Sequence, residues 1–267
     1  MWVAGFRALY LQALHPRTMR GTWQNSALID PKQAWGRFLR TGEYVRVRTF
    51  GSKNAVERAG RRVRKIHASL TGVDPDGTMF RLDEPEQLLW VHCGEISSYA
   101  EIAERSGMPL CRHDLDRFVD EQRSAAALVG LDPADVPASM AELAAYYESM
   151  RPKLYACEEA RKVLRMSFNP AVPRALLPLK AVAPPLNTLA FATLPRWARR
   201  MYGVPDTPLT DLWATATLRA LHQATRPLPD QVRYPPQVRR ARQRVREYER
   251  EQRRLAAWPV TRPGMLT

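Results

Sequence analysis

Apolar residues recur at helical spacing along most of this chain, and this periodicity constrains the fold more than any other feature. In the first segment, Phe6, Leu9, Tyr10 and Ala13 share one face of a helix over residues 2–14. The same spacing predicts further helices over residues 31–51, 54–70, 83–107, 113–129, 138–150, 153–167, 207–225 and 235–257. Because no linker separates two apolar cores, we predict an all-α fold built around one core.

Two segments interrupt the helical pattern. Residues 73–82 contain a turn signal, Asp76-Gly77, between short extended pieces, and they predict one small β-hairpin. Residues 176–195 are apolar but hold four prolines, so we expect a buried irregular segment there rather than a helix. The alternative for that segment is a lipid-facing entrance for an apolar substrate. His15-Pro16 is expected to end the first helix, and Asp30 to cap the next.

The chain carries 41 basic and 27 acidic residues, a formal net charge of +14, which raises the question of a polyanionic partner. Only six basic residues are Lys, so much of the charge is an arginine bias spread over solvated helices. The densest part lies between Arg233 and Arg254, where nine Arg stand against three Glu. We therefore divide the chain into a helical domain, residues 1–230, and a basic C-terminal helix and tail, residues 231–267. The basic stretch has only two aromatic residues, Tyr234 and Tyr248, and no preceding helix-turn-helix signature, which disfavours nucleic acid.

Cysteine usage and the N-terminal sequence bear on the compartment. Cys93, Cys111 and Cys157 are too few and too widely spaced for a zinc ribbon or a disulfide framework. The apolar run over residues 1–16 contains Arg7 and lacks a small-residue cleavage site, so it differs from a signal peptide. We expect a reduced, cytoplasmic protein, with peripheral membrane association as an option.

Among the five histidines, His67 has the surroundings that an iron ligand needs. Ile66 and Leu70 flank it on an apolar helix face, and Arg64 stands one turn earlier. A neutral imidazole projecting into an apolar cavity suits haem iron, and Arg64 could pair with a propionate. The alternative is a core histidine with an ordinary hydrogen-bond partner. His92, within another apolar helix, could line the same cavity or satisfy a buried network.

A second polar group, Arg37, Arg40 and Thr41, lies on neighbouring faces of the helix over residues 31–51. Guanidinium and hydroxyl groups that face one cavity could orient dioxygen and stabilise developing negative charge. A solvated helix face is the simpler interpretation of the same residues. The sequence has no signature of a phosphate-binding loop, a dinucleotide fold, a serine hydrolase or a zinc protease.

Five stretches in register resemble one protein family. They run from Arg7 to Pro16, from Asp30 to Gly42, from Val63 to Gly72, from Leu88 to His92 and from Leu194 to Gly203. In order and spacing they are similar to the MpaB-type oxygenases and the latex-clearing rubber oxygenases.

The resemblance implies an all-helical, globin-like domain that holds haem b. It makes His67 the proximal iron ligand and matches Arg37 and Thr41 to residues of the distal side. We add Arg64 and His92 as candidate cofactor-binding residues. At Arg40 the rubber-oxygenase branch has Lys, whose amine can coordinate iron when neutral, whereas a guanidinium stays protonated and cannot.

The sequence therefore predicts a haem b-dependent oxygenase, of dioxygenase or monooxygenase type, acting on an apolar alkene such as an isoprenoid or lipid. Its partners are that substrate, dioxygen and, where the reaction needs electrons, a redox protein. Two alternatives stay open. One is a non-enzymatic basic helical protein that binds nucleic acid or an anionic membrane surface. The other is a non-haem metal site formed by His15, His67 and His92.

Overall fold

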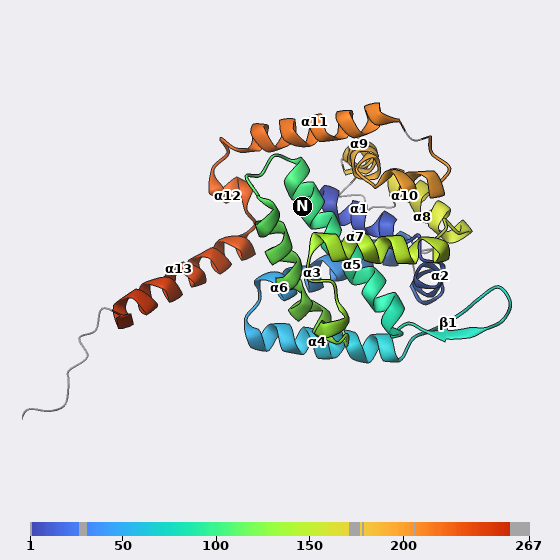
Figure 1. The fold of residues 1–267 in the computed structure, drawn as a ribbon, viewed down its shortest axis with the longest axis horizontal. Coiled ribbons are helices and arrows are strands. Elements are labelled where there is room, and N and C mark those ends of the chain that lie inside the picture. The colour runs from blue at the N-terminus through green and yellow to red at the C-terminus, as the bar shows by residue number, and fades with distance from the viewer. Residues whose placement is uncertain (1, 27–30, 171–176, 178, 206, 257–267) are drawn as a thin grey trace, which may run out of the picture.

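The computed structural model describes residues 2–26, 31–170, 177, 179–205 and 207–256, and helices make up most of it (Figure 1). The helices are α1 (Trp2–Gln12), α2 (Pro16–Asn25), α3 (Pro31–Phe50), α4 (Lys53–Ala68), α5 (Pro85–Arg105), α6 (Arg112–Ala127), α7 (Met140–Met150), α8 (Glu158–Phe168), α9 (Leu179–Ala192), α10 (Arg196–Met201), α11 (Pro208–Thr225), α12 (Asp230–Arg233) and α13 (Pro236–Ala256). The strands of the described residues, β1 (Thr71–Val73) and β2 (Met79–Arg81), pair antiparallel. The predicted all-α fold with one hairpin is confirmed.

The hydrophobic core forms where α1, α5 and α9 pack against one another near the middle of the molecule (Figure 1). Trp90 of α5 is fully buried among Leu11, Leu14 and Tyr147 of the same cluster. Its indole Nε1 donates a hydrogen bond of 3.0 Å to the backbone oxygen of Gln12 at the end of α1. The indole therefore adds both apolar burial and a hydrogen bond to the α1–α5 contact.

A buried arginine ties this core together. Arg7 of α1 has no exposed surface, and its guanidinium donates to the Thr193 oxygen at 3.1 Å and to Ser98 Oγ at 2.7 Å. It also forms an ion pair with Glu101 of α5. A buried charge is tolerated when it is paired and its donors are used, and Arg7 meets both conditions.

The structure contains a helix, α2, that the periodicity analysis did not predict. Pro16 was expected only to end the first helix, but α1 ends at Gln12 and Pro16 is the first residue of α2. His15 is the N-cap residue, and its Nδ1 accepts a hydrogen bond of 3.2 Å from the backbone N–H of Thr18. Proline suits the first helical turn because that position has no intrahelical N–H partner to lose.

The prediction of an irregular segment, made because of its prolines, is wrong where the structure describes that segment. Residues 179–192 form α9, with Pro184 and Pro185 inside the helix. Both prolines are exposed, whereas Ala183, Asn187 and Ala190 of the opposite face are buried. The carbonyls that lose their helical partners therefore lie near solvent, and packing of the buried face outweighs that loss. Leu176 and Pro178 lie outside the described residues, as does the predicted cap Asp30.

The hairpin forms where the turn signal predicts it. Gly77 has φ +88°, the left-handed conformation that glycine adopts without strain, and Asp76 Oδ1 accepts a hydrogen bond of 2.9 Å from the Thr78 N–H. Opposite Phe80, Gly72 leaves room for the ring, since a Cβ there would stand 2.3 Å from it. The hairpin connects α4 to α5, the two helices that carry His67 and His92.

Three peripheral helices frame this core. In Figure 1, α4 lies along one edge of the molecule and α11 along the opposite edge, while α13 extends away from the body. The last helix, α13, lies on the surface, since its described side chains are mostly exposed. No helix within the described ranges combines the length and the hydropathy that crossing a bilayer requires.

Candidate cofactor site

Helices α3, α4 and α5 carry the residues that the sequence singled out. Arg37, Tyr44 and Arg48 follow one another at spacings of seven and four, so they share one face of α3. On α4, Gly60 and His67 share a face in the same way. Gly60 is buried against the end of α6, where a Cβ would lie 3.0 Å from the Leu128 oxygen. A larger residue at position 60 would therefore push α4 away from the body.

His67 is half-buried, and its Nδ1 is buried without a hydrogen-bond partner among the described residues. Burial lowers the pKa of His67; the negative charge of Asp83 opposes this, and the positive charge of Arg37 adds to it. The ring is therefore neutral at pH 7, the form in which imidazole binds a metal. A buried ring nitrogen left unpaired costs about 1–3 kcal/mol, which a group from outside the chain could offset.

Arg37 of the neighbouring helix α3 lies near enough for its positive charge to lower the pKa of His67. Its side chain is half-buried, and within the described part of the chain it forms no hydrogen bond or ion pair. Burial and the positive charge of Arg40 both lower the pKa of Arg37, and its own charge reaches His67. The structure thus brings two of the predicted residues, Arg37 and His67, close together with hydrogen-bonding capacity to spare.

Three other predicted residues lie at the margin of this pair. Thr41 and Arg40 are exposed on α3, and Arg40 Nη1 folds over Gly36, 3.4 Å from the place of its missing Cβ. Arg64 is exposed, and its Nη1 donates a hydrogen bond of 2.8 Å to the Leu128 oxygen. That bond ties α4 to the end of α6, so Arg64 also has a structural role.

His92 of α5 is buried beside an ion pair. Arg48 Nη1 and Nη2 donate to the two carboxylate oxygens of Glu95 at 3.1 and 2.8 Å, and both side chains are largely buried. Burial, with a contribution from the positive charge of Arg48, lowers the pKa of His92 to about 4. His92 is therefore neutral at pH 7, and the Arg48–Glu95 ion pair joins α3 to α5.

Sequence reasoning missed Tyr44, Arg48, Glu95 and Asp83. The Tyr44 hydroxyl is buried with no hydrogen-bond partner in the residues that the structure describes. Tyr44 could have been identified from its position seven residues after Arg37, because that spacing puts both side chains on one helix face. The Arg48–Glu95 pair joins residues far apart in the chain, which no local spacing predicts.

The alternative of a metal bound by three histidines finds no support in the described residues. His15 uses Nδ1 to cap α2, and its Nε2 lies 3.4 Å from Glu86 Oε1, away from the α3–α4 pair. No group of three or more His, Cys, Asp or Glu side chains that could hold a metal ion occurs in the ranges described. The His15 ring thus bonds a neighbouring backbone N–H, that of Thr18.

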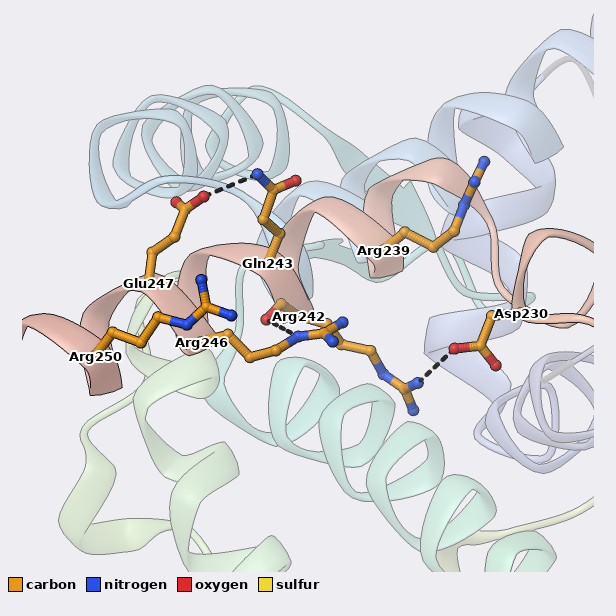
Figure 2. Close-up of a pocket in the computed structure, with 7 residues that line it drawn as sticks. All are labelled: Asp230, Arg239, Arg242, Gln243, Arg246, Glu247 and Arg250. Carbon is orange, nitrogen blue, oxygen red and sulfur yellow. Dashed lines mark hydrogen bonds and ion pairs between the residues drawn. The ribbon is translucent and has the colours of Figure 1, made fainter.

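Two surface pockets lie away from His67. One, of about 440 Å³, is lined by residues of α3, α4 and α6 and includes Arg48, Val56 and Leu128. The other, of about 420 Å³, runs along α13 (Figure 2). Neither of these two pockets is lined by Arg37, Thr41 or His67.

The described residues thus form an all-α protein in which the charge of Arg37, an arginine of α3 with no ion pair among them, acts on a neutral histidine of α4. Residues 1–228 match the family described as "ER-bound oxygenase mpaB/B'/Rubber oxygenase, catalytic domain". This chain belongs to that family, which makes it an oxygenase-type oxidoreductase that acts on a small molecule and dioxygen. Comparisons with curated proteins and with solved structures gave no match.

Proposed function

We propose that this chain is a haem b-dependent oxygenase, of dioxygenase or monooxygenase type, for an apolar alkene such as an isoprenoid or lipid. One observation carries the proposal. Among the described residues, His67 Nδ1, the Tyr44 hydroxyl and the Arg37 guanidinium form no hydrogen bond or ion pair. All three belong to the adjoining helices α3 and α4. Polar groups left without partners in one place fit a ligand that completes them.

In this proposal His67 is the iron ligand. Its neutral ring has nitrogen lone-pair capacity available at pH 7, and its Nδ1 is buried without a partner among the described residues. Asp83 stands near enough for its charge to act on the ring, so it favours hydrogen-bond donation by a metal-bound imidazole. Bound haem supplies the dioxygen and one-electron chemistry that no side chain of this protein can supply.

Arg37 and Thr41 act on dioxygen and on the charge that develops during its reaction. The Arg37 guanidinium stays protonated and has five N–H donors, none of which is used elsewhere in the described chain. Thr41 lies one helical turn further on the same face and adds a hydroxyl donor. Arg40 adds positive charge at the rim of the site, where it favours an anionic group without coordinating iron.

Arg64 and His92 support the cofactor in this account. Arg64 is exposed and can exchange its bond to the Leu128 oxygen for an ion pair with a propionate. His92, neutral and buried beside the Arg48–Glu95 pair, lines the site from α5. We place these functions in residues 1–230, with residues 231–267 as a separate basic helix and tail, and a redox protein as partner where electrons are needed. The buried free thiols of Cys93 and Cys157 suit a reduced, cytoplasmic setting.

The proposal is tested by turnover. Haemin-loaded protein is incubated with a series of isoprenoid alkenes, aerobically and anaerobically, with and without a chemical reductant, and oxygenated products are identified by mass spectrometry. We expect products only in air, and a loss of rate of about 100-fold or more in Arg37→Gln, because a charged donor to the reacting oxygen is removed. The control is Arg58→Gln, an exposed arginine of α4, which should react like the wild type. Haem-loaded protein that leaves every alkene unchanged contradicts the proposal.

A further inference from the structure

Helix α11 has an apolar face that points to solvent. Leu209, Leu212 and Trp213 are 74%, 67% and 48% exposed, and Ala216 and Ala220 continue the same face at helical spacing. The opposite face packs into the protein through Ala214 and Leu218, which are buried. A surface helix that is apolar on both faces marks an interaction site, because an exposed apolar face costs free energy in water.

The exposed apolar side chains continue toward the C-terminus. Leu228 and Val232 are exposed in the α11–α12 segment, and Val245 and Tyr248 are exposed on α13. In Figure 1 these elements follow one another at the edge of the molecule, from α11 through α12 to α13. The C-terminal part of the described chain, from α11 to α13, therefore presents apolar groups to solvent over three successive helices.

Helix α13 adds a row of arginines. Arg239, Arg242, Arg246 and Arg250 lie at spacings of three and four, and all four line the pocket along this helix (Figure 2). We call these four residues the arginine row. In Figure 2 the side chains of Arg242, Arg246 and Arg250 point the same way along the helix, toward Asp230. The face that bears Val245 adjoins the row.

Most of this positive charge is not neutralised. Arg242 stacks on Tyr234 at 3.8 Å and lies 3.9 Å from Asp230, but Arg239, Arg246 and Arg250 form no ion pair within the described residues. Helix α13 as a whole has eight arginines and three glutamates. At its base, Arg244 Nη2 donates a 2.5 Å hydrogen bond to the Phe50 oxygen, which anchors α13 to the end of α3. The row is thus an anchored cationic surface, in which three of the four arginines have no ion pair among the described residues.

We propose that α11 and α13 dock this protein on an anionic lipid bilayer, with the apolar face of α11 entering the interface and the arginine row binding lipid phosphates. Helices that bind membranes in this way combine an apolar face with arginines, and Trp and Leu are the side chains that enter the interface. The charge supplies attraction to anionic headgroups, and the apolar face supplies attachment that salt does not screen.

The charge and the apolar face together favour a bilayer over other partners. Nucleic acid would use the arginine row but leave the exposed Leu209, Leu212 and Trp213 in water. A second copy of the chain could cover α11, but it would bring two arginine rows into one assembly. The docking surface does not depend on the oxygenase chemistry, so it can be tested on the protein with or without cofactor.

The test is sedimentation of the full chain with phosphatidylcholine vesicles, with and without phosphatidylglycerol. We expect binding to the anionic vesicles, with part of it persisting at high salt. Replacing the arginine row by glutamine should weaken binding about 100-fold or more, since each arginine near an anionic surface contributes about fivefold. Leu209→Ser, Leu212→Ser and Trp213→Ser together should leave only binding that high salt abolishes.

A matched control removes four exposed arginines from other helices, Arg58, Arg112, Arg117 and Arg165, and replaces them with glutamine. This variant has the same net charge as the arginine-row variant and should keep nearly all of its vesicle binding. Circular dichroism and thermal unfolding verify that each variant folds. Because the changed side chains are exposed, we expect unchanged transitions.

Three results overturn the proposal. Equal loss of binding in the control and in the arginine-row variant would show that net charge, not this surface, attracts the vesicles. Salt-dependent binding to duplex DNA without vesicle binding would assign the row to nucleic acid. A dimer in light scattering that the three serine substitutions dissolve, again without vesicle binding, would assign α11 to self-association.

Discussion

Arg7 and Arg37 are both arginines of the N-terminal helices, but their surroundings are opposite. Arg7 is completely buried, and its donors are used by Thr193, Ser98 and Glu101. Arg37 is half-buried in α3 and has no partner among the described residues, and its charge acts on a histidine with a buried, unpaired nitrogen. The first arrangement is complete within the chain and holds helices together. The second is incomplete among the described residues, because its polar groups have no partners there.

Two tyrosines show the same contrast. The Tyr147 hydroxyl lies 2.6 Å from Ser97 Oγ and donates to the Cys93 oxygen at 2.9 Å. The Tyr44 hydroxyl is buried with no partner within the described ranges, and so is that of Tyr146 on α7. The Tyr146 hydroxyl is a single group without a partner, and its ring packs against the core. Tyr44 lies on the helix pair α3–α4, which carries three polar groups without partners among the described residues. The clustering, rather than any single atom, distinguishes the site from the core.

The largest expected effect comes from removing Arg7, whose hydrogen bonds are complete within the chain. Arg7→Ala leaves Glu101, Ser98 and the Thr193 oxygen without their shared donor, so we expect the free energy of unfolding to fall by about 3–5 kcal/mol. Arg37→Ala removes no hydrogen bond or ion pair of the described residues, and we expect a change of about 0.5 kcal/mol or less. Urea unfolding of the cofactor-free proteins measures both. Similar decreases in the free energy of unfolding of the two variants would contradict the distinction between Arg7 and Arg37.

A slightly smaller effect depends on pH. The pKa of His92 is lowered to about 4 in the folded protein, so the unfolded chain binds a proton first as the pH falls. The unfolding free energy is then highest above about pH 6.5 and decreases by about 3 kcal/mol by pH 4. His15 and His67 have pKa shifts in the same direction and add to this slope.

The contribution of His92 to the pH dependence of the unfolding free energy is isolated by His92→Gln, which keeps a polar side chain beside Arg48 and Glu95. Urea unfolding of both proteins between pH 4 and 7 should show a shallower slope in the variant. Parallel slopes would mean that His92 is not buried beside the cation as the structure has it.

The smallest effect compares the two tyrosines. Tyr147→Phe removes a hydroxyl that has two partners and should lower the free energy of unfolding by about 1–2 kcal/mol. Tyr44→Phe removes an unpaired hydroxyl and should be neutral or slightly stabilising in the cofactor-free protein. Thermal unfolding of both variants is the measurement. A clear loss in Tyr44→Phe would indicate a partner within the protein and weaken the ligand interpretation.

The spacing of apolar residues predicted most of the helices, because the buried face of an amphipathic helix can be recognised from its own sequence. The spacing did not predict the helices that contain or begin with proline. Pro16 begins α2 instead of only ending α1, and Pro184 and Pro185 lie within α9 because they face solvent. Which face of a proline-containing helix is buried depends on its neighbours in space, and periodicity alone cannot supply that.

In the candidate site, too, features of a single helix were predicted and contacts between distant helices were not. His67 and Arg37 were identified from their own helices, and the structure brings His67 within reach of the positive charge of Arg37. The Arg48–Glu95 pair and the influence of Asp83 on His67 depend on contacts between helices distant in the chain. Thr41 was expected beside these residues and lies exposed on the same helix face, so its part in the site stays a prediction.

The most direct test of the incomplete arrangement is the absorbance spectrum of the protein titrated with haemin, recorded oxidised and then reduced with dithionite. We predict saturable binding with a Soret band that shifts on reduction, and loss or strong weakening of that band in His67→Ala. His222→Ala, which changes a histidine near the end of α11, is the matched control and should keep the wild-type spectrum. A wild-type protein that binds no haemin, or a His67→Ala variant with an unchanged spectrum, would contradict the account.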